Sequence, residues 1–254
     1  MSMRLINAEF LKLRKRRGLV AAVSGVTIGP MVITYMVLLG LHASNPGKYG
    51  PAGGLENFQP SMDVLSTLTI VAAVLIGATL GTGDLTAGVF RELVVTGRSR
   101  LSLYASRVPA GLALLLVPVG VAFAITAAAS LVFAGSLEAP SGTVLAQSGA
   151  WIALVAALSM AIALGVASLF SSRGTSIGIL LGWQLGLMPV LLAIGSLGAA
   201  REGLFYAATD RLRPAVVDAN TTVPTTLLTA LIVLVAWTAI PLALGAWRTV
   251  TRDA

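Results

Sequence analysis

The sequence predicts an all-α membrane protein with six transmembrane helices and with both termini in the cytoplasm. Of its 254 residues, 56% are hydrophobic, and 17 Lys and Arg stand against 10 Asp and Glu. Six stretches of at least 20 residues contain no charged residue, and about 20 apolar residues span a bilayer core as a helix. Strand-like alternation is absent, so helices must satisfy the backbone in lipid. This composition excludes a water-soluble globular enzyme.

The apolar parts of these stretches predict the spans in chain order, within a single transmembrane domain over residues 1–254. They are 19–41, 63–83, 108–134, 150–170, 175–197 and 225–247. Turn signals such as Asn45-Pro46-Gly47 and Pro140-Ser141-Gly142 separate them. The first stretch is longer than a typical signal-peptide core, which favours an uncleaved anchor over a cleaved signal.

The distribution of basic residues predicts the orientation. With the amino terminus inside, thirteen Lys and Arg lie in cytoplasmic segments and four lie outside. Positive residues concentrate on the cytoplasmic side of membrane proteins. The segment 198–224 would then be extracellular, although it carries Arg201, Arg211 and Arg213.

Residues 1–17 predict an amphipathic helix before the first span. Ile6, Phe10 and Leu13 fall on one helical face and basic residues flank it. Such a helix can lie in the lipid headgroup layer. The alternative is a positively charged anchor that only sets topology.

A second cytoplasmic helix is expected at 84–98. Asp84 can cap it, Leu85, Val89 and Leu93 form an apolar row, and Ser99 can cap the following helix. A short helix of this kind suits docking to a soluble partner. An ordinary surface loop with arginines that set topology is the alternative.

The residue types in the sequence do not support a catalytic function. The chain has no Cys and a single histidine, His42, so we expect no catalytic residue and no metal site. Gly81-Thr82-Gly83-Asp84 matches the pattern of intramembrane aspartyl proteases, but these need a second aspartate nearby. Asp63 would lie about 30 Å away along the same helix. No phosphate-binding loop is present, so any nucleotide would be bound by another polypeptide.

Small residues mark two spans. Gly77 and Gly81 share the second span, and a four-residue glycine repeat from Gly174 to Gly186 includes Gly178 and Gly182. This spacing lets helices approach closely, either as packing or along a pathway or dimer seam. Gln184 is the most polar residue deep in a span and is expected to form an interhelical hydrogen bond.

These features together resemble the permease subunits of type-2 ABC exporters. The resemblance covers nearly the whole chain. It is carried by the basic helix Ala8-Glu9-Phe10-Leu11-Lys12-Leu13-Arg14-Lys15, by Gly83-Asp84 with Gly88-Val89-Phe90-Arg91, by Thr96-Gly97-Arg98-Ser99-Arg100 with Tyr104-Ala105-Ser106-Arg107, and by Leu212-Arg213-Pro214-Ala215.

The resemblance implies roles for several of these residues. A coupling helix near 84–98 would sit in a cleft of a separate ABC ATPase, which would bind ATP and Mg, so this chain would hold no cofactor. The arginines of that segment would pair with acidic groups of the ATPase or with lipid phosphate. The expected coupling residues are Asp84, Gly88, Arg91, Glu92, Arg98 and Arg100; those of the connecting helix are Glu9, Phe10, Lys12 and Arg14; those of the pathway or dimer packing are Gly77, Gly81, Gly178, Gly182 and Gln184.

The expected function is export of an amphipathic or lipid-like substrate across the inner membrane of a bacterium. The expected partners are the ATPase, a second permease copy or paralogue, and membrane lipid, with no nucleic acid. A secondary transporter or channel is an alternative, although the predicted spans lack the charged groups that such proteins use. A membrane scaffold or immunity protein without transport activity is a further alternative.

Overall fold

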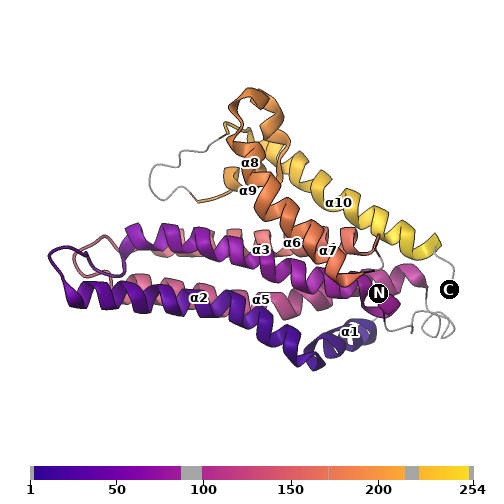
Figure 1. The fold of residues 1–254 in the computed structure, drawn as a ribbon, viewed down its shortest axis with the longest axis horizontal. Helices are drawn as coiled ribbons and strands as arrows, with labels where there is room; N and C mark the ends of the chain where they lie inside the picture. The colour runs from indigo at the N-terminus through magenta and orange to yellow at the C-terminus, as the bar shows by residue number, and fades with distance from the viewer. Residues whose placement is uncertain (1–2, 87–98, 171, 215–222, 252–254) are drawn as a thin grey trace.

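The computed structural model describes residues 3–86, 99–170, 172–214 and 223–251. All regular structure in this part of the chain is helical (Figure 1). The elements are α1 (Met3–Lys15), α2 (Arg17–Ser44), α3 (Gly54–Thr86), α5 (Arg100–Val132), α6 (Gly142–Ala167), α7 (Arg173–Leu181), the π-helical turn η1 (Gly182–Leu187), α8 (Met188–Ala193), the 3₁₀ segment η2 (Gly195–Gly203), α9 (Phe205–Arg211) and α10 (Leu227–Thr251).

Among the described residues, six helical segments are long and apolar enough to cross a membrane. They are α2, α3, α5, α6, the run from α7 to α8, and α10. This confirms the predicted all-α fold and the number of spans. The expected amphipathic helix in residues 1–17 is also present as α1.

The second span begins nine residues earlier than predicted, at Gly54 instead of residue 63. The backbone N–H of Gly53 donates to the carbonyl of Phe133 over 2.7 Å, and Leu55 donates to Glu138 over 2.7 Å. The loop after α5 therefore holds the start of α3. The polar residues in this turn hid the helix from a hydropathy criterion, and Asp63 lies inside α3 rather than at its end.

The third span also begins earlier, at Arg100. The Ser99 hydroxyl accepts a hydrogen bond from the backbone of Ser102, which confirms the predicted cap. Arg107, expected in a loop, is instead buried within α5.

The predicted cap at Asp84 is wrong, because α3 continues without a break through Thr86. The glycines at 81 and 83 do not end the helix. Residues 87–98 lie outside the described part of the chain, and so do the side chains of 84–86.

The α3 and α6 helices form the centre of the molecule. Each buries two thirds of its most apolar window, whereas α10 buries 11%. The start of α1, the end of α3, the start of α5 and the end of α10 gather at one end of the molecule (Figure 1). The α8, η2 and α9 segments lie away from that end (Figure 1), and η2 and α9 pack against α10.

Candidate functional site

The predicted coupling segment is described only at its two edges. Asp84 lies in the last turn of α3, and Gly88, Arg91, Glu92 and Arg98 lie outside the described residues. Arg100 is the first residue of α5, and its Nη1 donates to the carbonyl of Val250 over 2.9 Å. This contact links the start of α5 to the last turn of α10.

The predicted connecting helix packs along α5. Glu9 is buried, and Lys12 donates to its carboxylate over 2.6 Å. Leu13 is also buried. Phe10 and Arg14 line a largely apolar cavity of about 270 Å³ against α2 and α5. The helix therefore rests on the bundle as well as having an exposed polar face.

Gly77 and Gly81 form a close contact between α3 and α6. A methyl group on Gly77 would lie 2.5 Å from the Cβ of Ala163, and one on Gly81 would lie 2.7 Å from the Cβ of Ala167. Only glycine permits this approach. The two glycines therefore serve a helix interface within one chain rather than a seam between chains.

Gly178 and Gly182 have different surroundings. A methyl group on either would meet no described atom outside its own helix within 4 Å, so this glycine face is open in the described chain. The side chain of Gln184 does not lie on this open glycine face, because only 2% of the residue's surface is exposed. Its Oε1 accepts no hydrogen bond from the described residues, so the interhelical hydrogen bond expected there is not made by this atom.

A cavity of about 480 Å³ lies where α3 and α6 meet the η1–α9 region. We call it the α3–α9 cavity. Its walls come from α3, α6, η1, α8 and α9, and from the residues just after α9. They are Asp63, Ser66, Thr67, Ile70, Trp151, Val155, Leu185, Pro189, Leu192, Tyr206, Thr209, Asp210 and Arg213.

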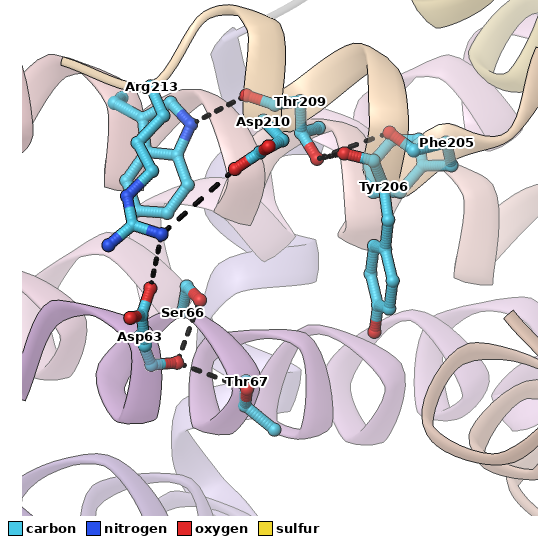
Figure 2. A network of polar contacts seen from close by, with 9 residues as sticks. Asp63, Ser66, Thr67, Phe205, Tyr206, Thr209, Asp210 and Arg213 are labelled. Carbon is cyan, nitrogen blue, oxygen red and sulfur yellow. Dashed lines mark hydrogen bonds and ion pairs between the residues drawn. The ribbon is translucent and has the colours of Figure 1, made fainter. Parts of the chain in front are cut away.

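Three charged side chains meet at one wall of the α3–α9 cavity (Figure 2). Arg213 Nη1 lies 2.6 Å from Asp63 Oδ1 and 4.0 Å from Asp210 Oδ1. The Arg213 side chain is 22% exposed, the Asp63 side chain 51% and the Asp210 side chain 36%. The guanidinium is therefore the most enclosed of the three, and it bridges α3 to α9.

Three further contacts hold the segment between the fifth and sixth spans in place. Trp151 Nε1 on α6 donates to the carbonyl of Thr209 over 2.9 Å, and Arg213 lies over the Trp151 ring, 5.7 Å from its centroid. Trp237 Nε1 on α10 donates to the carbonyl of Gly203 over 2.9 Å. The α9 region therefore contacts α6 through Trp151 and α3 through the Arg213–Asp63 ion pair, and η2 contacts α10 through Trp237.

Burial shifts the ionisation of two groups on α9. Burial raises the pKa of Asp210 above its ordinary value of 3.8; Arg213 opposes this rise and Asp63 adds to it. Burial also raises the pKa of Tyr206 to about 12, so its phenol stays neutral at physiological pH. With both carboxylates ionised, the cavity wall carries two negative charges against one positive charge.

Sequence reasoning missed this cavity. It treated Asp63 as a span end and Arg213 as one of three arginines on the unexpected side of the membrane. The signal that was available is the presence of acidic and basic residues at the ends of different spans. No group of three or more His, Cys, Asp or Glu residues suited to a metal ion occurs in the described ranges.

The six candidate spans define a multi-pass membrane protein, and a cavity with charged and apolar walls lies beside them. Residues 5–188 match the model of a family described as ABC-2 family transporter protein. The chain therefore belongs to the ABC-2 transporter family, and this confirms the resemblance to ABC permease subunits. No curated protein matches the chain. Membrane domains of this family are transport subunits that generally lack an ATPase of their own and work with an ABC ATPase.

Proposed function

We propose that the chain is the permease subunit of an ATP-driven ABC exporter. It moves an amphipathic or lipid-like substrate out of the cytoplasm, and a separate ATPase subunit binds Mg and hydrolyses ATP. The observation that carries this proposal is the family match over residues 5–188. That range includes most of α1, the first four candidate spans and most of the fifth.

The arrangement of the helix ends supports a single cytoplasmic face. The start of α1, the ends of α3 and α5 that flank residues 87–98, and the end of α10 gather at one end of the molecule (Figure 1). The basic residues of 1–17 belong to the same end, as expected for a side facing the cytoplasm. The protein would occupy the plasma membrane of a bacterium.

The segment 84–98 would be the coupling helix that contacts the ATPase. Gly88 would allow close approach, and Arg91, Glu92, Arg98 and Arg100 would form ion pairs with it. Movement of the ATPase would then be transmitted through α3 and α5, the helices on either side of this segment, without a covalent step on the permease.

A second permease copy or paralogue would complete the transporter. The open face of Gly178 and Gly182 supports this part of the proposal, because no described atom of the chain outside their own helix covers it. Small residues at four-residue spacing favour close helix association in lipid.

Copurification from membranes tests the proposed partnership. The affinity-tagged chain should bring down a soluble protein with a Walker motif, and Gly88→Trp or Arg91→Glu should abolish this association. The tryptophan side chain would prevent the ATPase from approaching the backbone at position 88. Charge reversal at position 91 would replace the proposed ion pair with repulsion.

Lys48→Glu is the matched control, because it reverses one charge on an exposed loop between α2 and α3. It should leave the association unchanged. Failure of the unaltered chain to recruit any ATPase would overturn the proposal, and so would equal recruitment by the Arg91→Glu variant.

A further inference from the structure

The largely apolar cavity of about 270 Å³ between α1, α2 and α5 is separate from the site described above. We call it the α1–α5 cavity. Its apolar wall consists mainly of branched side chains of α2 and α5, namely Val20, Val23, Ile28, Leu114, Val117 and Val121. From Val20 to Ile28 this wall follows α2 for about 12 Å along the helix axis. The wall is therefore long enough to cover part of a fatty acyl chain.

The α1–α5 cavity opens on the outer surface of the helix bundle. Val117 is 66% exposed and Val121 is 44% exposed. In the described chain, no lining residue comes from α3 or α6, the two most deeply buried spans. In a bilayer this surface faces lipid, so lipid acyl chains can enter the cavity directly from the membrane.

The end of the cavity at α1 carries a positive charge. Arg14 lines the cavity beside Phe10, which lies one turn earlier on the same face of α1. Arg14 is exposed, and none of the described residues forms an ion pair with it. Arg14 is also the only charged residue among the described lining residues. Its guanidinium is therefore available to a ligand in the cavity.

The charges around this end are mostly of the same sign. Residues 1–17 hold six Lys and Arg and a single acidic residue, Glu9. Lys12 already binds the Glu9 carboxylate over 2.6 Å. Arg17, at the start of α2, is exposed like Arg14. This end therefore favours an anionic headgroup, whose phosphate can bind a guanidinium through charge-assisted hydrogen bonds.

We propose that the α1–α5 cavity binds one anionic phospholipid, with its phosphate on Arg14 and one acyl chain along the apolar wall of α2 and α5. This lipid stays in its site and is not the cargo. It contacts all three helices and so stabilises the position of α1 against the bundle. The inference goes beyond the permease function and does not rest on it, because it requires only this chain.

Native mass spectrometry of the purified full chain in detergent, with no ATPase present, tests the site. The probes are phosphatidylglycerol and phosphatidylcholine with identical acyl chains, added in equal amounts. We expect one phosphatidylglycerol molecule to remain bound in preference to phosphatidylcholine. Equal retention of the two lipids would overturn the proposal, because burial of the acyl chains alone would then explain binding.

Two pairs of variants assign the lipid to this cavity. Arg14→Gln should lower the affinity for phosphatidylglycerol about fivefold, as expected when one cation is removed beside an anionic headgroup. Arg4→Gln is the matched control, because it removes an exposed arginine of α1 that does not line the cavity. Ala113→Phe should block binding by filling the cavity. Val132→Phe, at the exposed far end of α5, should have no effect.

Melting temperatures in detergent provide a second measurement. Added phosphatidylglycerol should raise the melting temperature of the unaltered chain and of Arg4→Gln, because a ligand that binds only the folded state stabilises it. The rise should be smaller in Arg14→Gln, which alters an exposed side chain and replaces Ala113→Phe if the latter aggregates.

Unchanged phosphatidylglycerol binding in both Arg14→Gln and Ala113→Phe would contradict the site. A dimer that dissociates in Ala113→Phe, as measured by size exclusion, would also overturn the proposal, because the cavity would then be covered by a second copy of the chain. Selective lipid binding by a chain that recruits no ATPase would leave the site in place and overturn the permease proposal. ATPase recruitment without selective lipid binding would do the reverse.

Discussion

Asp210 is held in an environment that disfavours its charge. Burial raises its pKa, Asp63 raises it further, and the Arg213 guanidinium only partly offsets these effects. The charged groups that act on it are Asp63 on α3 and Arg213 just after α9. Perturbed pKa values cluster at functional sites and also occur in structural ion-pair networks.

The raised pKa predicts the sign of a pH effect on stability. The folded protein binds the Asp210 proton more readily than the unfolded chain, so this stabilisation is present below the unfolded pKa and is lost as pH rises through the folded pKa. Asp210→Asn fixes the neutral form. It should raise the melting temperature at neutral pH, and the difference from the unaltered protein should shrink toward pH 4.

Thermal unfolding in detergent between pH 4 and pH 8 measures this effect. The control is Glu56→Gln, which neutralises an exposed carboxylate in the first turn of α3. A lower melting temperature for Asp210→Asn at neutral pH would show that its ion pair with Arg213 outweighs its burial.

The pairing of Asp63 with Arg213 could not be predicted from the sequence. The two residues are 150 positions apart, and they meet only because α9 lies over α3. Their charges were visible in the sequence, but the distance between them is a tertiary property. The hydrogen bonding of Gln184 is also a tertiary property. A polar residue in a span was expected to form an interhelical hydrogen bond, but its Oε1 has no partner among the described residues.

At the scale of elements, the glycine repeats have two different roles. Gly77 lies where a methyl group would meet Ala163 at 2.5 Å and the backbone nitrogen of Leu164 at 2.8 Å. Gly178 has open space around it in the described chain. The glycine spacing is the same in both spans. Only the structure shows that the glycines of α3 contact α6, whereas those of the fifth span lie on an uncovered face.

Alanine substitution should reveal this difference. Gly77→Ala must separate α3 from α6 or strain both helices, which costs about 1–3 kcal/mol. Gly178→Ala adds the same atoms without a clash and should be close to neutral in the monomer. Melting temperatures in detergent provide the comparison, and equal loss in both variants would contradict the assigned packing.

The lengths of the spans were predicted less well than their number. A hydropathy criterion recognises the apolar window, so α2 and α10 were found near their places, whereas α6 begins eight residues before its predicted start at residue 150. It misses helical turns whose polar residues are satisfied by tertiary contacts, such as the first turns of α3 and α5. The broken fifth span was also beyond it, because a π-helical turn at Gly182–Leu187 leaves no clear signal in composition.

At the scale of the whole molecule, the six candidate spans, the family match and the gathering of both termini at one end agree with a permease driven from that end. The chain offers no phosphate-binding loop of its own. The proposed permease takes its energy from a partner ATPase, whereas a secondary transporter would take it from an ion gradient, and these two sources are separable by experiment.

Uptake of a radiolabelled short-chain phospholipid, a probe of the proposed amphipathic or lipid-like substrate class, into inside-out membrane vesicles that contain the chain and its copurifying ATPase tests the central claim most directly. The account predicts accumulation that requires ATP, persists when a protonophore removes the proton gradient, and is lost in Arg91→Glu but not in Lys48→Glu. Accumulation that proceeds without ATP and collapses with the proton gradient would contradict it.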